Sequence, residues 1–216
     1  MSQTDLLQIY DLDLSYNNVS SLKGYFFLNI FLVNVLNLSF NSLTNVDGDA
    51  FAGMLTVGTT ASLDFSFNNL STISFDNFLS HVYNLILSHN EFKDFKLSNL
   101  GVSVCNSLDL SFNKLLAVDD FPDAPVDSYC QNISNSGLHM AILDLSYNHI
   151  PFFGVRRKPI FNNWYIGIIN ISHNVLVFIG HAFSPIKGQA GSLPRTSYLD
   201  LRYCVYLYYS YKSNLC

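Results

Sequence analysis

Charged residues are scarce in this 216-residue chain. Only 12% of the residues are Asp, Glu, Lys or Arg, whereas 49% are hydrophobic. Disordered chains show the opposite composition, so this chain can bury a large core. The net charge is −5, and the only basic cluster is Arg156-Arg157-Lys158. We therefore expect no nucleic-acid partner, because such a partner requires a basic surface.

Long apolar runs are also missing. Asn29, Asn34 and Asn37 interrupt the nearest example, residues 25–38, so no transmembrane helix is predicted. Residues 1–16 have neither a basic start nor an apolar stretch and do not resemble a signal peptide. The repeats begin within ten residues of Met1, which leaves no room for the polar cap that a solenoid needs. We therefore expect a fragment, a truncated gene product or an eroded copy.

The usual signatures of catalysis do not occur. The six histidines lie in no metal-ligand spacing, and there is neither a Cys-x-x-Cys pair nor a glycine-rich phosphate loop. The recurring serines belong to the repeated phrase described next. We expect no enzyme, no metal and no cofactor.

One short phrase recurs along the chain: an apolar residue, any residue, an apolar residue, usually Ser, any residue, and Asn. Residues 12–17 (LDLSYN) and 143–148 (LDLSYN) spell it identically. We call the last place the closing position. It is held by Asn17, Asn41, Asn68, Asn90, Asn113, Asn148, Asn174 and, in an eighth copy, Cys204. Such self-similarity predicts a solenoid of stacked coils.

Apolar residues recur at fixed distances from the closing position. The places eight, five and three before it, and two and five after it, give 35 slots in the seven Asn copies, and only Thr60 is not apolar. The apolar-x-apolar core has the period of a strand with one buried face. Strands one repeat apart should therefore stack in parallel. We expect the closing Asn to be buried and to bond the backbone of its own and the adjacent coil.

These phrases resemble leucine-rich repeats, in which Asn or Cys holds the closing position. The resemblance covers residues 6–209. It implies an α/β-type repeat solenoid, a horseshoe with a parallel concave β-sheet and an irregular or helical convex side. We expect one array of about eight repeats over residues 1–216. The spacing of 35 between Asn113 and Asn148 contains a polar, acidic insert at about 119–138, which we expect to be an exposed loop.

The amino-acid sequences of the repeats are most similar to the extracellular repeats of plant receptor-like proteins, as in residues 63–68 (LDFSFN). Their Gly-x-Ile-Pro step after Asn is missing, and the apolar residue five places after Asn suits Toll-type repeats. The resemblance implies a non-catalytic module that recognises a protein or peptide ligand, with a co-receptor, in defence or developmental signalling. Its location would be extracellular or at the cell surface. A cytoplasmic leucine-rich repeat scaffold is the alternative, and a decayed receptor copy is a third.

The concave face is the expected binding surface, because a curved stack presents it as an extended surface. Its outward places lie four and six residues before each closing position. The first row is rich in Asp and suits a basic peptide or a cation, unless its carboxylates are merely solvated. The second row differs in side-chain type from repeat to repeat. This variation indicates either specificity for a ligand or random sequence drift. The candidates are Asp13, Val35, Asn37, Ser62, Asp64, Asn84, Ile86, Ser107, Asp109, Ile142, Asp144, Ile168, Asn170, Tyr198 and Asp200.

The residue before every closing position is aromatic or His. Exposed aromatic rows can be recognition hot spots, but here we favour a spine of rings stacked between coils. Only two members titrate near neutral pH, His89 and His173. The row is Tyr16, Phe40, Phe67, His89, Phe112, Tyr147, His173 and Tyr203.

Four cysteines allow three pairings. Cys105 fills an apolar slot and Cys204 a closing position, so both are expected to be reduced. A Cys105–Cys130 bridge that tethers the insert is the alternative. Glycosylation is expected at Asn18, Asn69 and Asn132, which begin Asn-x-Ser triplets. Asn37 and Asn170 begin such triplets too, but a glycan there would obstruct the concave face.

Overall fold

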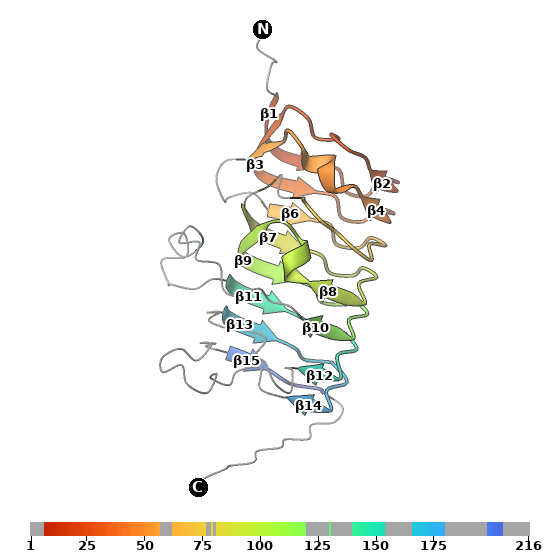
Figure 1. Ribbon diagram of the computed structural model, residues 1–216, viewed down its shortest axis with the longest axis vertical. Coiled ribbons are helices and arrows are strands. Elements are labelled where there is room, and N and C mark those ends of the chain that lie inside the picture. The colour runs from red at the N-terminus through yellow and green to blue at the C-terminus, as the bar shows by residue number, and fades with distance from the viewer. Residues whose placement is uncertain are drawn as a thin grey trace.

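The computed structural model describes residues 7–56, 62–76, 79, 81–119, 130, 140–153, 166–179 and 198–204. Its main feature is one parallel sheet, in which each strand pairs with the next along the chain (Figure 1). This arrangement confirms the predicted solenoid. In order, the strands are β1 (Leu7–Asp13), β3 (Ile30–Asn37), β6 (Ser62–Asp64), β7 (His81–Ile86), β9 (Ser103–Asp109), β11 (Met140–Asp144), β13 (Ile166–Asn170) and β15 (Tyr198–Asp200), and β5 (Leu55–Thr56) also pairs with β3. We number the coils 1 to 8 by these eight strands.

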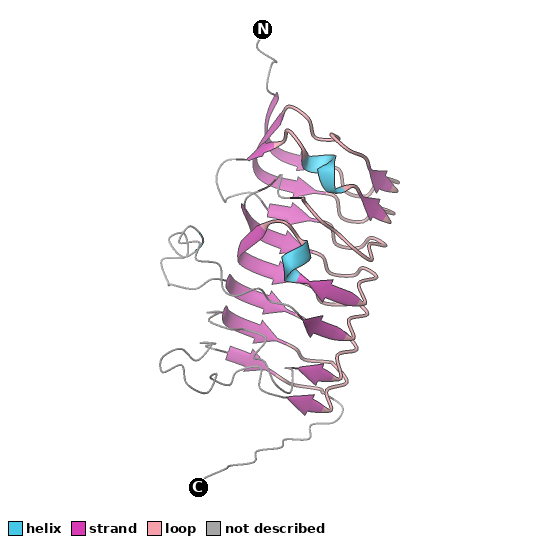
Figure 2. Ribbon diagram, viewed as in Figure 1, coloured by secondary structure: helices cyan, strands magenta, loops and turns pink. Residues whose placement is uncertain are grey.

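The returning half of each coil is mostly irregular. Short strands there pair in parallel, two by two, and two 3₁₀ turns lie between them and the main sheet (Figure 2). The described residues of the convex side therefore contain little helix. The elements are β2 (Ser21–Leu22) with β4 (Asn45–Val46), β8 (Asp94–Lys96) with β10 (Ala117–Asp119), β12 (Phe152–Phe153) with β14 (Phe178–Ile179), and the turns η1 (Gly48–Phe51) and η2 (Leu97–Asn99).

The strand pairing aligns the phrases as the sequence predicts. The residue five places before each closing position lies opposite its equivalent in the next coil, and most of these side chains are fully buried. The matched series is Leu12, Leu36, Leu63, Leu85, Leu108, Leu143, Ile169 and Leu199. Burial of this apolar row across the stack supplies much of the hydrophobic free energy of folding.

The closing asparagines join neighbouring coils. The Nδ2 of Asn148 donates to Leu145 O and Ser146 O, both at 3.1 Å, and to Leu110 O of the preceding coil at 2.9 Å. Its Oδ1 accepts the backbone N–H of Leu115, also in the preceding coil, at 2.9 Å. The same four bonds recur at Asn41, Asn68, Asn90, Asn113 and Asn174.

We expect every closing residue to be buried, and this is confirmed at Asn68, Asn90, Asn113, Asn148 and Asn174. Asn41 and Cys204 are half-buried, and at Asn17 the prediction is wrong. Asn17 is exposed and its amide nitrogen bonds only Leu14 O and Ser15 O of its own coil. Among the described residues no coil precedes β1 to cover it. At the other end, the thiol of Cys204 donates to Ile171 O at 3.5 Å, a weak imitation of the amide.

The expectation that Cys105 is reduced is also wrong. Cys105 lies in its buried slot in β9 and forms a disulfide with Cys130, 25 residues further on. The rest of the predicted insert, residues 120–129 and 131–138, lies outside the described residues. Cys204 is a free, half-buried thiol, and burial raises its pKa. The bridge was the alternative pairing that the sequence left open.

Replacing a closing asparagine in the middle of the array should be strongly destabilising. The change Asn148→Ala removes four hydrogen bonds and leaves the buried Leu115 N–H without its partner, which should lower the free energy of unfolding by on the order of 3 kcal/mol. Urea denaturation followed by circular dichroism measures this loss. The matched control, Asn17→Ala, should cost about 1 kcal/mol or less, because Asn17 is exposed and spans no coils. Equal losses would contradict the role of the asparagine as a link between coils.

Candidate functional site

The structure brings the predicted concave residues onto one face. The place six before each closing position forms one row across the sheet, and the place four before forms a second row beside it. Each residue of a row is opposite its equivalent in the next strand, as Ile142 is opposite Ile168 and Asp144 opposite Asn170. The register connects all fifteen candidates, from Asp13 in β1 to Tyr198 and Asp200 in β15.

The row four places before the closing position has a structural role that the sequence analysis missed. In each Asp or Asn member, the side-chain Oδ1 accepts the backbone N–H two residues later. Asp64 accepts from Ser66 at 2.8 Å, and Asp109 accepts from Ser111 at 2.9 Å. This is an Asx turn, and the recurring Asp-x-Ser spelling was the signal for it. The others are Asp13, Asn37, Asp144, Asn170 and Asp200, whereas Ile86 has no acceptor to offer.

The residue before each closing position takes a left-handed backbone conformation, whether or not an Asx turn precedes it. All eight members of the aromatic row have φ between 52° and 58°. Bulky side chains rarely adopt this conformation, and it costs on the order of 1 kcal/mol or more per residue. In most coils an Asx turn on one side and the closing Asn on the other support this bend, whereas coil 4 has Ile86 in place of the Asx residue and coil 8 has Cys204 in place of Asn.

The aromatic row forms the predicted spine of stacked rings. Neighbouring ring centroids lie 4.0–4.5 Å apart, and the planes are within 12° of parallel except between His173 and Tyr203, where the angle is 28°. The spine runs along the surface, since Phe112 and Tyr147 are each 42% exposed. Each ring face is covered by the next ring, so the stack stabilises the coils while the ring edges contact solvent.

The chemistry of the concave face changes along the array. In its middle, Asn84 accepts from Asn106 Nδ2 at 2.8 Å and from the Ser107 hydroxyl at 2.7 Å, and donates to Ser62 Oγ at 2.9 Å. In the last three coils the same row is apolar and exposed, at Ile142, Ile168 and Tyr198. The face therefore offers a polar centre and an apolar C-terminal end beside a second row in which Asp is the commonest residue.

Hydrogen bonds hold two of the concave carboxylates in the charged form. At the exposed Asp13, bonds from the Ser15 side chain and backbone lower the pKa. At Asp200, the Arg202 side chain donates from Nε at 3.0 Å to both carboxylate oxygens and from NH2 at 2.6 Å to Oδ2, and this guanidinium lowers the pKa of Asp200. Arg202 thus neutralises the acidic row at its C-terminal end.

The asparagines that begin Asn-x-Ser triplets fall into two structural groups. Asn18 and Asn69 are exposed beside the closing position, where a glycan has room to project. On the concave face, Asn37 accepts from Ser39 N at 3.0 Å and Asn170 donates to Asp144 Oδ2 at 3.0 Å. Asn132 lies outside the described residues. Glycosylation at Asn18, Asn69 and Asn132 stays a prediction.

Neither a metal site nor a membrane span is visible in the described part of the chain. There, no group of three or more His, Cys, Asp or Glu side chains is placed to hold a metal ion. No helix within the same ranges is long and apolar enough to cross a bilayer.

Comparison with known proteins supports the leucine-rich repeat fold. The family model described as "Leucine rich repeat" matches residues 8–57. A solved leucine-rich repeat protein from Bacteroides thetaiotaomicron VPI-5482 aligns with a TM-score of 0.57 and 22% identity, over 90% of this chain and 22% of its own length. A search of curated proteins gives no match. At this identity the structural likeness shows the fold alone, and this chain spans less than a quarter of that protein.

The Asx turns can be tested by separating charge from hydrogen bonding. Asp109→Asn keeps an Oδ1 acceptor for Ser111 N–H and should leave the free energy of unfolding nearly unchanged, whereas Asp109→Ala should lower it by about 1 kcal/mol. The reverse change, Ile86→Asn, should add the missing bond and raise it by about 0.5 kcal/mol. Urea denaturation of the three variants measures the differences. Equal losses for Asp109→Asn and Asp109→Ala would show that only the charge matters.

The Asp200–Arg202 pair predicts a pH dependence. The folded-state pKa of Asp200 is lowered, so its contribution to stability is present above the ordinary Asp pKa and is lost as the pH falls through the lowered value. Arg202→Met should raise the pKa of Asp200 toward its ordinary value, and Arg202→Lys should raise it less, since Lys cannot bind both oxygens in a fork. NMR titration of the Asp200 carboxyl carbon measures the shift. An unchanged pKa in Arg202→Met would contradict the pairing.

Proposed function

We propose that this leucine-rich repeat solenoid is a non-catalytic module that binds a basic, extended segment of a protein or peptide across its concave face. The observation that carries the proposal is the row of outward carboxylates and amides over the parallel sheet, which Ile86 alone interrupts among the described strands. Four carboxylates, Asp13, Asp64, Asp109 and Asp144, lie on one face at the same place in their coils, whereas the fifth, Asp200, is buried and paired with Arg202. Leucine-rich repeat domains generally bind proteins, which supports a protein or peptide ligand.

The Asx turns leave the negative charge of the row available. Asp64, Asp109 and Asp144 use Oδ1 to accept a backbone N–H, which brings no opposite charge to the carboxylate, and all three side chains are half-exposed. Adjacent strands of a sheet are ~4.8 Å apart. The guanidinium or ammonium groups of an extended basic segment can therefore meet several carboxylates in turn, which favours a basic ligand and speeds its association.

The proposed setting is the ectodomain of a plant receptor-like protein in defence or developmental signalling, acting with a co-receptor. Its support is the wording of the repeats, together with one feature of the structure. The Cys105–Cys130 disulfide favours an oxidising compartment, because such bonds persist outside the cytosol. We accordingly place the chain outside the cell or at its surface rather than in the cytoplasm.

A random 12-residue peptide display library, selected on the immobilised chain, tests the binding face. We expect the enriched peptides to carry Lys or Arg. The triple change Asp64→Asn, Asp109→Asn and Asp144→Asn keeps the Asx turns but removes three charges, and it should weaken binding of a selected peptide at least tenfold. The matched control, Asp47→Asn, Glu91→Gln and Asp94→Asn, removes three charges away from the concave face and should leave binding within about twofold. Equal losses, or selected peptides without basic residues, would refute the proposal.

A further inference from the structure

The side of the solenoid beyond the closing position is chemically divided. We call the residues one, three and four places after each closing position the lateral face. In coils 2 to 4 every one of these residues is polar or charged. In coils 5 to 7 most are apolar. The polar half is Ser42, Thr44, Asn45, Asn69, Ser71, Thr72, Glu91, Lys93 and Asp94, and the other half includes Leu116, Ala117, Pro151, Phe152, Val175 and Val177.

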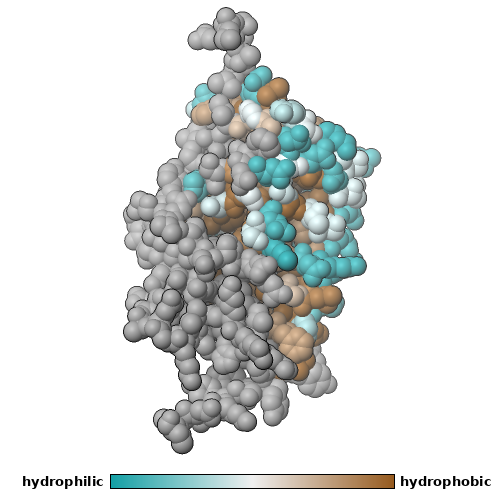
Figure 3. All heavy atoms as spheres, viewed as in Figure 1, coloured by the Kyte–Doolittle hydropathy of each residue, from teal (hydrophilic) through white to brown (hydrophobic). Residues whose placement is uncertain are grey.

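Four of the apolar residues form one exposed patch. Phe152 is 56% exposed, Leu116 55%, Val177 43% and Val175 39%. Backbone hydrogen bonds keep equivalent places of neighbouring coils together, as Val177 N–H donates to Pro151 O at 2.8 Å. We call Leu116, Phe152, Val175 and Val177 the lateral patch. Figure 3 shows the contrast: hydrophilic surface covers the upper coils beside β4 and β8, and hydrophobic surface lies toward β12 and β14.

The repeat itself shows that the fold does not require this patch. Thr44 and Ser71 occupy the place of Leu116 and Val177, and Asn45 and Thr72 occupy the place of Phe152, in coils with the same positive-φ turn before the closing position. Apolar side chains there remain largely in water and so contribute little to folding. Contiguous exposed apolar surface on a protein usually marks an interaction site.

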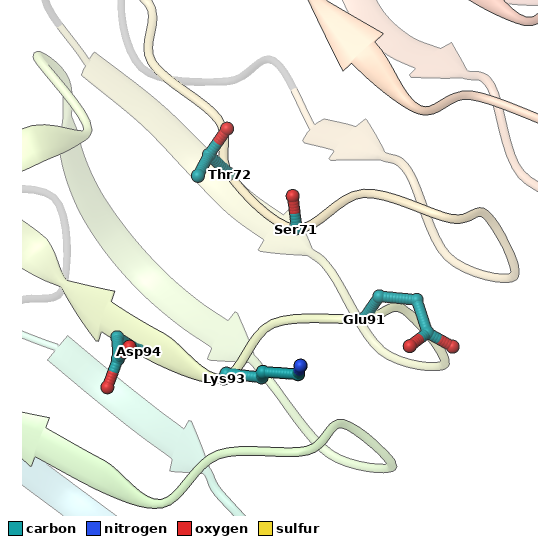
Figure 4. A pocket seen from close by; sticks show the side chains of 5 residues that line it. All are labelled: Ser71, Thr72, Glu91, Lys93 and Asp94. Atoms are coloured by element: carbon teal, nitrogen blue, oxygen red, sulfur yellow. The ribbon is translucent and has the colours of Figure 1, made fainter.

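The charges beside the lateral patch are of both signs. Glu91 forms an ion pair with Lys114 of the next coil, and Lys93 and Asp94 are exposed. Figure 4 shows Glu91, Lys93 and Asp94 lining a shallow depression together with Ser71 and Thr72 of the preceding coil. Two acids and two bases give this region no net charge. Two copies of this surface would therefore not repel each other electrostatically. Two concave faces would repel each other, because each carries a row rich in Asp.

We propose that the lateral patch binds the lateral patch of a second copy of this chain, forming a two-fold symmetric dimer. A two-fold axis parallel to the stack keeps each coil level with its copy. Each apolar side chain of the lateral patch then contacts the same residue of the second copy, at Leu116, Phe152 and Val177. The polar lateral surfaces of the two copies also face each other, and their acidic and basic side chains can form ion pairs. This pairing leaves both concave faces free, so it stands independently of the ligand proposed above. It would also present two ligand-binding faces and increase binding to a repeated or clustered ligand.

Sedimentation equilibrium of the full 216-residue chain over a concentration series tests the dimer. We expect a reversible monomer–dimer equilibrium. The triple change Leu116→Thr, Phe152→Asn and Val177→Ser installs residues that coils 2 and 3 carry at the same places, and it should raise the dimer dissociation constant at least tenfold. The matched control makes the same replacements at exposed apolar places of the concave face, Val35→Thr, Ile142→Asn and Ile168→Ser, and should leave the dissociation constant within about twofold.

Circular dichroism melting shows whether each variant folds. If the triple variant does not, the single change Phe152→Asn serves in its place and should still raise the dissociation constant at least threefold. A chain that stays monomeric at every concentration would overturn the proposal, and so would equal weakening by the lateral and concave variants. Either result would leave the peptide selection unaffected, because that experiment measures binding to the concave face, which is accessible in a monomer as well as in a dimer.

Discussion

In every inner coil of this solenoid, one side-chain amide meets the backbone groups that a sharp turn would leave unpaired. The closing asparagine donates to three carbonyl oxygens and accepts one N–H, and two of these four partners belong to the preceding coil. Buried backbone groups without partners are expensive, so the turn can be buried only if such a residue is present. The apolar rows can pack only after the turn has brought each strand level with the last, and the burial of the core therefore depends on this amide.

The bend requires further stabilising interactions, because the backbone of its central residue has a positive φ. The Asx turn before it and the closing asparagine after it fix the bend, and stacking between successive rings helps to offset its backbone cost. The recurring positions of the repeat then have distinct structural roles. Apolar residues form the core, Asp forms the Asx turn, the aromatic ring stacks in the spine, and Asn links neighbouring coils. Glycine would relieve the strain at the bend but would leave no ring to stack.

The register and the core were predictable because they depend on periodicity, which the sequence displays directly. Leu36 and Leu108 recur at a fixed distance from Asn41 and Asn113, so their burial required no knowledge of the turn. The Asx bonds were missed because the carboxylate of Asp109 was assigned only to the outward face, without regard to the backbone two residues later. The Cys105–Cys130 bond was left open, since its partner lies in an insert that breaks the period. The plant receptor-like setting and the glycans remain predictions.

What the scaffold demands also shows where the molecule is free to vary. The row four before the closing position is constrained by the turn, so its acidity is partly a by-product of the fold. The row six before it carries no such bond, and its change from Ser62 and Asn84 to Ile142 and Ile168 is not required by the coil. The same reasoning applies to the lateral face, where Thr44 and Leu116 occupy equivalent places. Recognition is therefore best sought where equivalent places differ between coils, and in this chain both such surfaces become apolar toward the C-terminal coils.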